Sequence, residues 1–431
     1  MRITLHRPHQ IGGCITVIEA DGVKIIIDLG SNLPGTNKEE LTKAQVAEIT
    51  AGADAIFFTH YHGDHTGLIH MVPEGIPQLI GKGAKEVMMC KHSTLARAAK
   101  RFDGVDSQKY KDAMVALSAA RRMHSYRKEE RIDVGNKGKL FVTPYFVSHS
   151  AFDAYMFLIE CEGKKILHTG DFRRHGYLGK GLFPTLKKYI GKVDLLITEG
   201  TMLGRKQEQI VTEHQIQLNT IQALSNHKYV FALCSSTDID RLASFHAACK
   251  ATGRIFFVDE YQRKVLDIFT DYSGKKSPLY DFDHVFELRG YKSYRIEKIT
   301  NYLKGKGFLM PVRMNSLWLI EDLMQVFTDE SPWLLYSMWN GYAEKNGKNS
   351  LESVMAIRRL FGTRILDGVR NGFHTSGHAD ARTLQEVCEA VSPSIGVIPI
   401  HKDAESQYVS HGFRVFEEGQ ATIDGIEIDV N

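Results

Sequence analysis

The sequence lacks the features that mark membrane and exported proteins. It has no uninterrupted apolar run that approaches the roughly 20 residues of a membrane-spanning helix, and no charged and then apolar leader opens it. Its six cysteines include no CxxC pair, and such scattered cysteines are typical of reduced thiols in the cytosol. We therefore expect a cytoplasmic, globular enzyme with no membrane partner. Low-complexity tracts and internal repeats are also absent, which argues against a linker-rich or repetitive chain.

The sequence also has no strong excess of charge and no phosphate-binding loop. Its 54 basic and 51 acidic side chains give a formal net charge of +3 at pH 7, so no field over the whole molecule attracts a polyanion. A nucleic acid would have to bind a local basic patch. The segments GKGAK and SGKKS lack the glycine spacing of Walker-type and dinucleotide-binding loops, so neither predicts a nucleotide cofactor.

The length and the order of the expected elements indicate one domain inserted into another. A chain of 431 residues with 43% hydrophobic content can bury more than one compact core. Its first part reads as successive strands, with the hairpin signal DG between ITVIEA and VKIIIDLG. From Gly204 onward, helices alternate with apolar strands, which is typical of a parallel α/β sheet. We therefore predict a first domain over residues 1–203, an insertion over 204–363 and the completion of the first domain over 364–431.

The segment HYHGDH, directly after the apolar strand AIFFT, is the strongest chemical signal in the sequence. Histidines two apart on an extended segment point to the same side, so His60 and His62 can bind one metal ion. Asp64 and His65 lie at the turn into the next helix and can bind a second ion, roughly 3.5 to 4 Å away as in other two-metal sites. A surface loop holds a single histidine by chance often enough, but this spaced group of four favours a metal site.

Three further candidates follow predicted strands, where loops converge on a rigid sheet. His149 ends the segment FVTPYFVSH and suits a third ligand of the first ion. Asp171 in HTGDF can bridge both ions through its two oxygens, although aspartate after glycine is also a common turn residue. Asp28 ends the strand VKIII and is predicted to orient a ligand histidine from behind, with an ordinary turn aspartate as the alternative.

The order Asp28, HYHGDH, His149 and Asp171 resembles the metallo-β-lactamase superfamily across residues 1 to about 203. Three later motifs, TEGT, SGHA and PIH, resemble the β-CASP group of nucleases. The segments FHTSGHAD, HTGDF and VSHS are most similar to the ribonuclease J family, and the resemblance covers nearly the whole chain. It implies an α/β fold in which a metallo-β-lactamase αββα sandwich carries an inserted β-CASP-type parallel α/β domain.

Carried over residue by residue, the resemblance implies roles for residues in the later motifs. His401 is the implied late ligand of the second ion, and Glu199 and His378 are implied to form a pair beside the leaving group. The implied contacts to substrate phosphates are Ser236, Arg241, His374 and Ser376. A helix-capping serine is an equal alternative for Ser236. The full predicted set of metal ligands is His60, His62, Asp64, His65, His149, Asp171 and His401.

The resemblance implies a nuclease that hydrolyses phosphodiester bonds with two divalent metal ions, Zn²⁺ or Mn²⁺, because histidine and aspartate bind both. A hydroxide that bridges the ions is the implied nucleophile. We predict Asp64, Glu199 and His378 as catalytic residues, with His378 as the proton donor to the departing 3′ oxygen. RNA is favoured over DNA as the nucleic acid substrate, and the ribonuclease J family implies exonuclease activity and a homo-oligomer.

The sequence departs from the ribonuclease J pattern in two places. PIHKD places Lys402 where PIHGE is common, and only 30 residues follow His401. We therefore expect the further C-terminal domain of that family to be absent, which leaves endonuclease action and a monomer open as alternatives.

Three other classes of protein stay open at this stage. A small-molecule hydrolase, such as a thioesterase or lactonase, shares the early ligands but needs neither the large insertion nor the Glu199 and His378 pair. A DNA-directed β-CASP nuclease shares all of these features. A non-catalytic scaffold of the same fold would have lost ligands, whereas every expected ligand type is present here.

Overall fold

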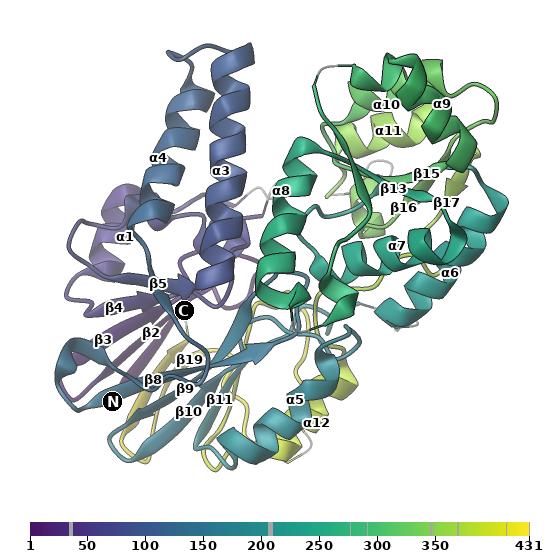
Figure 1. Cartoon of the computed structure of the whole chain (residues 1–431). Coiled ribbons are helices and arrows are strands. Elements are labelled where there is room, and N and C mark those ends of the chain that lie inside the picture. Colours follow the sequence, from purple (N-terminus) through teal and green to yellow (C-terminus); the bar gives the residue numbers. More distant parts are fainter. Residues whose placement is uncertain are drawn as a thin grey trace.

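The computed structural model describes residues 1–33, 38–205, 210–275, 277–290, 292–344, 347, 349–368, 370–410 and 412–430. Two sheets pack face to face in one body, and a third sheet with its own helices forms a second body beside them (Figure 1). The site lies where strands of the first body end, so the order of these strands is described first.

The first sheet has eight strands in the order β19-β20-β1-β2-β3-β4-β5-β6. The predicted hairpin between β2 and β3 is present: Ala20 pairs with Val23, and Asp21 and Gly22 between them have φ of 52° and 76°. Positive φ at both central residues is what a tight turn of this kind requires, which explains the DG pair. The strands are β1 (Arg2–His6), β2 (Ile15–Ala20), β3 (Val23–Ile27), β4 (Ala55–Phe57), β5 (Gln78–Gly81), β6 (His124–Tyr126), β19 (Gly419–Ile423) and β20 (Ile426–Val430).

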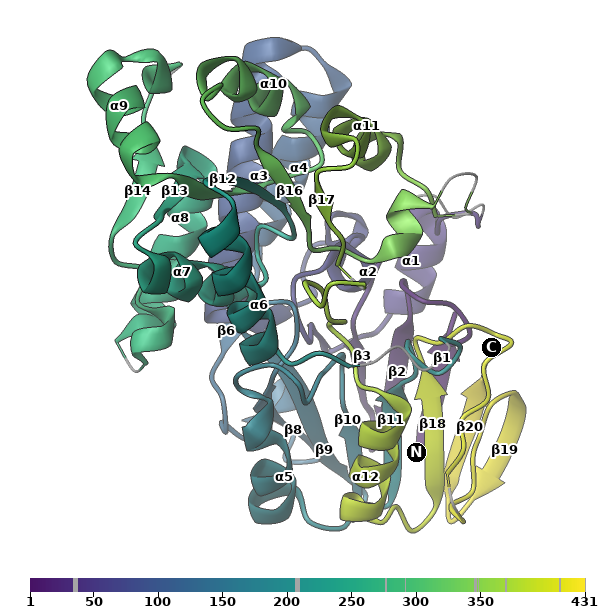
Figure 2. The same ribbon diagram turned by 90° about the vertical axis from the view of Figure 1, so that its right-hand side faces the viewer.

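The second sheet has six strands in the order β18-β11-β10-β9-β8-β7. Its strands are β7 (Ile132–Asp133), β8 (Leu140–Val147), β9 (Ala154–Cys161), β10 (Lys164–His168), β11 (Leu195–Glu199) and β18 (Gly396–Ile400). Late strands complete both sheets, because β18 pairs with β11 and β20 pairs with β1, each in parallel (Figure 2). The last part of the chain therefore joins the body that the first part begins.

Alternation of side chains along the strands builds four layers. Ile25 and Ile27 of β3 point into the core between the sheets, whereas Ile26 points to the helices on the outer face. Phe57 and Phe157, from opposite sheets, pack edge to face with 5.9 Å between their ring centres. The predicted αββα sandwich is therefore confirmed. Its helices are α1 (Lys43–Thr50), α2 (Gly63–Thr66), α3 (Lys82–Phe102) and α4 (Gln108–Arg122) on the first sheet, and α5 (Leu182–Thr185) and α12 (Ala381–Val391) on the second.

The third sheet has six strands in the order β14-β13-β15-β12-β16-β17, and every neighbouring pair is parallel. Its strands are β12 (Tyr229–Leu233), β13 (Ile255–Asp259), β14 (Val285–Leu288), β15 (Phe308–Val312), β16 (Trp333–Tyr336) and β17 (Ile365–Leu366). Its helices are α6 (Glu213–Asn226), α7 (Ile239–Thr252), α8 (Glu260–Phe269), α9 (Glu297–Lys306), α10 (Leu317–Val326) and α11 (Glu352–Phe361). An inserted parallel α/β body is thus present. Its last strand, β17, lies beyond the boundary predicted at residue 363, and the predicted domain limits stay predictions.

The inserted body packs on the sandwich through apolar side chains. Phe152, in the loop after β8, contacts Phe269 at the end of α8 with 4.9 Å between ring centres. Both rings belong to one hydrophobic cluster that also includes Val87 of α3 and Leu266 of α8. The two bodies therefore share buried surface, which fixes the loops of one against the strand ends of the other.

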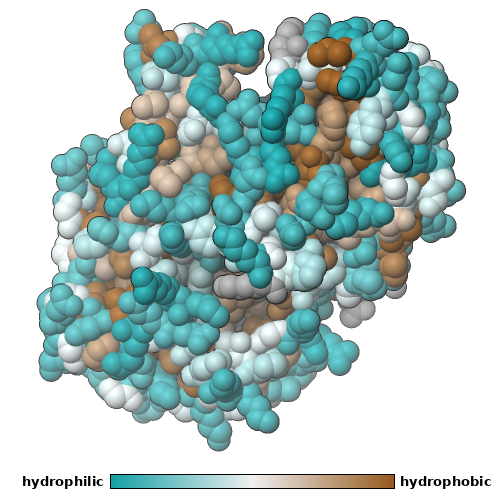
Figure 3. Space-filling model, viewed as in Figure 1, coloured by the Kyte–Doolittle hydropathy of each residue, from teal (hydrophilic) through white to brown (hydrophobic). Residues whose placement is uncertain are grey.

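On the face shown in Figure 3, hydrophilic side chains predominate and apolar ones are scattered among them. Within the ranges given above, no helix combines the length and the apolar composition that crossing a bilayer requires. All six cysteines are free, and five of them are buried.

Candidate metal centre

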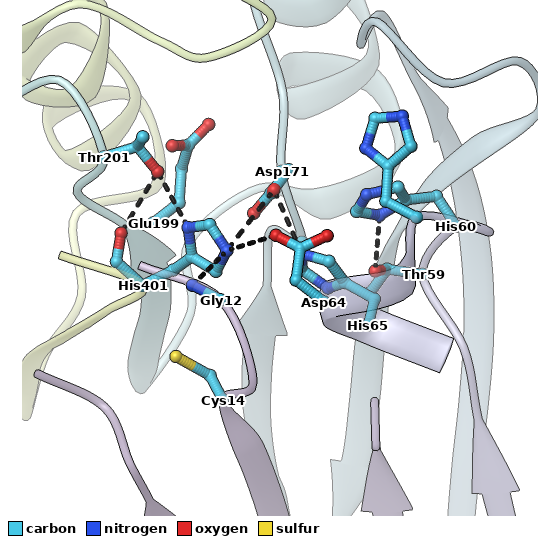
Figure 4. A network of polar contacts seen from close by, with 12 residues as sticks. Gly12, Cys14, Thr59, His60, Asp64, His65, Asp171, Glu199, Thr201 and His401 are labelled. Carbon is cyan, nitrogen blue, oxygen red and sulfur yellow. Dashed lines mark hydrogen bonds and ion pairs between the residues drawn. The ribbon is translucent and has the colours of Figure 1, made fainter. Parts of the chain in front are cut away.

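The predicted metal ligands lie at one edge of the sandwich, where strands of both sheets end. β4 leads into HYHGDH, β8 ends two residues before His149, β10 ends before Asp171, and β18 ends next to His401. Side chains from both sheets point towards a common centre in Figure 4, among them His60, Asp64, His65, Asp171 and His401. The strand ends hold these groups on a rigid frame.

Two residues of this edge have a backbone conformation that is unusual for a side chain with a Cβ atom. Asp28 has φ of 60° and His401 has φ of 53°. Such left-handed residues cost about 1 kcal/mol or more and persist where their surroundings fix them. Both turn the chain sharply at a strand end, which directs their side chains into the site.

His60, His62 and His149, the first ligand group, bring one nitrogen each within 4.8 Å of the others. Nε2 of His149 lies 3.3 Å from Nδ1 of His62. Nε2 of His60 is buried and has no hydrogen-bond partner. Burial lowers the pKa of His62 to about 4 and lowers the pKa values of His60 and His149 well below their ordinary range. These rings are therefore neutral at pH 7, as metal ligation requires.

Asp64, His65 and His401, the second ligand group, also bring one atom each within 4.8 Å of the others. Oδ2 of Asp64 lies 3.3 Å from Nε2 of His401 and 3.9 Å from Nε2 of His65. The backbone of Gly12 lies against this group, with its N–H 3.0 Å from Nε2 of His401. Gly12 has φ of +85°, and a Cβ atom there would lie 3.0 Å from Cβ of Asp64. Only glycine allows so close an approach of this loop.

The hydrogen bonds behind the rings fix which nitrogen faces the centre. Nδ1 of His149 lies 2.6 Å from the carbonyl oxygen of Gly377, and Nδ1 of His65 lies 2.8 Å from Oδ2 of Asp28. Because these oxygens only accept, each Nδ1 carries a proton and each Nε2 is the nitrogen that faces the site. Nε2 of His65 also faces an acceptor, Oδ2 of Asp171, and the carboxylates around this ring raise its pKa well above the ordinary value, so a metal ion would have to displace that second proton. Thr201 acts likewise on His401, since its hydroxyl lies 2.8 Å from Nδ1 of that ring and also donates to the carbonyl of His401.

Asp171 lies between the two ligand groups. Its Oδ2 atom is 3.1 Å from Nε2 of His65, 3.9 Å from Nε2 of His401 and 4.0 Å from Nε2 of His149. Burial favours the neutral carboxyl, but the imidazoles of His401, His65 and His378 outweigh burial and lower the pKa of Asp171 well below its ordinary value. A buried carboxylate of this kind needs positive charge around it, which bound metal ions would supply.

The residues present fit a pair of divalent cations. Imidazole nitrogens from five histidines converge, one of them, Nε2 of His60, is buried with no partner, and carboxylates from Asp64 and Asp171 lie among them. The carboxylates raise the pKa values of His65 and His401, so this centre attracts positive charge. The structure brings all seven predicted ligands together, and their assignment as ligands stays a prediction. Sequence reasoning missed Gly12 and Thr201, and only the glycine pair at residues 12 and 13 was a signal for either.

Glu199 and His378 are in contact beside the two ligand groups. Oε2 of Glu199 lies 2.8 Å from Nδ1 of His378, and Oε1 accepts the backbone N–H of Phe172 at 3.0 Å and of Ala379 at 3.3 Å. Nδ1 of His378 is 3.6 Å from Oδ2 of Asp171. The glutamate is buried, but 19% of the His378 side chain is exposed. The histidine can therefore meet both the centre and a molecule that enters from solvent.

The structure bears differently on the four residues predicted to contact substrate phosphates. The prediction for Arg241 is wrong, because this side chain is 2% exposed and its five N–H groups all donate to acceptors of Glu213, Ser337 and Thr375. No N–H of this guanidinium remains for a phosphate. Ser236 is half-buried, and its alternative as a helix cap is wrong, because the side chain of Asp238 accepts the N–H of Arg241 and caps α7.

His374 and Ser376 lie on the segment that carries His378. Nδ1 of His374 is buried without a hydrogen-bond partner, and burial with the nearby Arg241 lowers the pKa of this ring to about 3. The hydroxyl of Ser376 accepts the N–H of His378 at 3.2 Å. Both side chains are half-buried, and their predicted contacts to substrate stay predictions.

Comparison with known proteins supports the fold and points to distant relatives. Residues 24–232 match the model of the Beta-lactamase superfamily domain. Endoribonuclease YSH1 from Mycosarcoma maydis is 30% identical over 201 residues, which are 44% of this chain and 22% of that protein. Cleavage and polyadenylation specificity factor 73 from Drosophila melanogaster is 26% identical over 209 residues, which are 46% of this chain and 28% of that protein. The match thus spans about a quarter of each of these curated relatives.

One solved structure is similar over almost the whole chain. A protein of unknown function from Enterococcus faecalis V583 superposes with a TM-score of 0.69 over 96% of both chains, at 15% sequence identity. At that identity the likeness shows a common fold alone. The family model and this likeness therefore agree on the fold, and residues 24–232 are similar to the Beta-lactamase superfamily domain.

Proposed function

We propose that the chain is a metal-dependent nuclease that hydrolyses phosphodiester bonds, with RNA as its substrate in preference to DNA. The observation that carries the proposal is the contact between Glu199 and His378, in which Oε2 of Glu199 lies 2.8 Å from Nδ1 of His378. The same nitrogen lies 3.6 Å from Oδ2 of Asp171, the carboxylate between the two ligand groups. A departing sugar oxygen needs a proton, and a histidine held by a buried carboxylate can supply it. A thioesterase has a leaving group that needs no such donor.

The distant relatives support the same class of reaction. One is named an endoribonuclease and the other a cleavage and polyadenylation factor. Among the classes considered, these names favour a nuclease that acts on RNA. The closer likeness to ribonuclease J, exonuclease action, a cytoplasmic location and a homo-oligomer belong to the proposal as finer expectations.

In the proposed site, His60, His62 and His149 would hold one cation, and Asp64, His65 and His401 would hold the other. The carboxylate of Asp171, which lies between the two groups, would serve as a ligand of either. Bound divalent cations would lower the pKa of water and stabilise negative charge on phosphate oxygens. Zn²⁺ and Mn²⁺ both suit this set of imidazoles and carboxylates.

The chain's own residues then orient the substrate and move the proton. Glu199 engages Nδ1 of His378, so Nε2 is the nitrogen that can face the leaving oxygen. Glu199 itself is fixed by two backbone N–H groups, which keeps the ring in one orientation. Buried His60 and His149 exclude bulk water from one side of the centre.

Metal analysis and digestion of matched oligonucleotides test the proposal. RNA and DNA strands of one sequence, with 5′ hydroxyl or 5′ phosphate ends, are incubated with protein loaded with Zn²⁺ or Mn²⁺. We expect metal-dependent cleavage, faster on RNA, and product length distinguishes exonuclease from endonuclease action. Parallel assays with a thioester and a lactone serve as the alternative arm. Hydrolysis of these without any cleavage of nucleic acid would overturn the proposal.

A further inference from the structure

Five buried charged side chains form an ion-pair network where the inserted body meets the sandwich. Arg173, two residues after Asp171, contacts Glu213 at 3.1 Å, Asp238 at 3.0 Å and Asp240 at 3.2 Å. Arg241 contacts Glu213 at 2.9 Å. Arg173 comes from the sandwich, and the other four come from the start of α6 and α7.

The two arginines also bind backbone carbonyl groups of residues 373–379, which we call the His378 segment. Nη2 of Arg241 donates to the carbonyl oxygen of Thr375 at 3.3 Å, and Nη1 of Arg173 donates to that of Ser376 at 3.4 Å. Arg241 also contacts the hydroxyl of Ser337, which donates to the carbonyl oxygen of Phe373 at 2.6 Å. Three carbonyls of one short segment are therefore held from the same network.

The His378 segment needs this support because it contains no helix or strand. Buried carbonyl groups must find donors, and outside regular structure side chains can supply them. The two residues that follow the held carbonyls are Gly377 and His378. The carbonyl oxygen of Gly377 accepts a hydrogen bond from Nδ1 of His149 at 2.6 Å. The network thus acts one or two residues away from groups that face the centre.

We propose that Arg173 and Arg241 are positioning residues that hold the His378 segment in register, so that the inserted body sets the placement of His378 against the leaving group. The proposal rests on the proposed function for the role of His378. The sandwich alone therefore cannot hold the His378 segment in place, because four residues of the network belong to the insertion: Glu213, Asp238, Asp240 and Arg241.

Stability alone is a poor explanation for such a network. Removing charged groups from water costs several kcal/mol per ion, and apolar side chains of similar volume stabilise a core as well or better. Apolar side chains cannot donate to carbonyl groups, whereas the planar guanidinium offers five N–H groups in fixed directions. Arg241 uses all five, and three of the acceptors lie on the His378 segment or on Ser337, the serine that holds it.

Arg241→Lys is the first test, because lysine keeps the charge but cannot reach two carboxylate oxygens and two carbonyls together. Tyr280→Phe is the matched control: Tyr280 is buried and donates to Asp240 at 2.7 Å, so it belongs to the same network without contacting the His378 segment. In Arg241→Lys we expect kcat on RNA to fall about 100-fold with KM and metal content little changed, since misplacement by about 1 Å costs that much. The control should stay within about threefold of the wild type.

A double-mutant cycle separates positioning from general damage. If Arg241 acts through His378, Arg241→Lys should lower kcat no further in a His378→Ala background, because the group that it positions is gone. Equal losses in both backgrounds would overturn the proposal.

Hydrogen exchange in the metal-free protein gives a readout that needs no activity. Amides of residues 373–379 should exchange at least tenfold faster in Arg241→Lys than in Tyr280→Phe. Should Arg241→Lys fail to fold, Ser337→Ala removes the bond to the carbonyl of Phe373 and leaves the ion pairs intact, with the same expected change in exchange. Unchanged exchange overturns the proposal, whereas wild-type protein without nuclease activity overturns only the proposed function.

Discussion

Asp28 accepts a hydrogen bond from Nδ1 of His65, with 2.8 Å between nitrogen and Oδ2. The same carboxylate accepts the backbone N–H and the hydroxyl of Thr59, each at 2.8 Å. Because that hydroxyl donates to Asp28, it accepts from Nδ1 of His60 at 3.1 Å. One buried carboxylate therefore orients a histidine in each ligand group, directly in one and through a threonine in the other.

Replacing Asp28 should weaken metal binding without removing a ligand. In Asp28→Asn the amide can no longer accept all three bonds, so His65 and His60 lose their fixed orientation. We expect affinity for Zn²⁺ to fall about 10- to 100-fold, as for other partners behind metal ligands. Competition with a chromophoric chelator measures it. Asp54→Asn, at a partly exposed ion pair with Lys137, is the control, and equal affinities in the two variants would contradict the role of Asp28.

Changing a ligand should abolish hydrolysis and leave the fold largely intact. Asp171→Asn removes the charge between the two ligand groups, and His62→Ala removes one imidazole from the first. Both should show no measurable cleavage of RNA and a far-UV circular dichroism spectrum like that of the wild type. His70→Ala, at an exposed position, is the control for loss of a histidine. Full activity in either ligand variant would rule out the assigned centre.

His378→Ala should separate proton transfer from metal binding. We expect turnover to fall about 10²- to 10⁴-fold, the usual contribution of a general acid. Metal content by atomic emission should stay at the wild-type level, since the described ligand groups remain complete. Loss of all metal in this variant would show that the roles of His378 and the ligand histidines have been confused.

The buried ring of His168 should make the metal-free fold sensitive to acid. Burial lowers the pKa of His168 to about 4, from an ordinary value of 6.5. Between these values the unfolded chain binds a proton that the folded chain does not, so the free energy of unfolding falls as pH falls from 6.5 to 4. The full contribution is about 3 kcal/mol.

Denaturant unfolding in the presence of EDTA at pH 7, 5.5 and 4.5 measures this effect. His168→Gln has no proton to gain, so its free energy of unfolding should fall less with acid than that of the wild type. If the free energy of unfolding fell equally with pH in His168→Gln and in the wild type, the role of His168 in acid sensitivity would be wrong. His124→Gln, at an exposed position, should follow the wild type.

The sequence by itself determined the local features of this protein. The DG pair predicts the hairpin between β2 and β3, because only certain residues adopt positive φ at low cost. Alternating apolar residues predict strands with two faces, as Ile25 and Ile26 show. The HYHGDH spacing predicts a compact group of ligand-type residues, because four side chains within six positions stay together in almost any loop.

Only the tertiary structure decided what meets across long separations. Asp64 and His401 are 337 positions apart, and they meet because β4 and β18 end at the same edge of the sandwich. Whether a charged side chain faces solvent or a buried partner also depends on the whole fold. Arg241 is the clearest case: a motif suggested a phosphate contact, but packing of α6 against α7 gives its guanidinium Glu213 and the carbonyl of Thr375 instead. Patterns of a few residues fix local conformation, whereas partners of buried charges are fixed only when distant segments pack together.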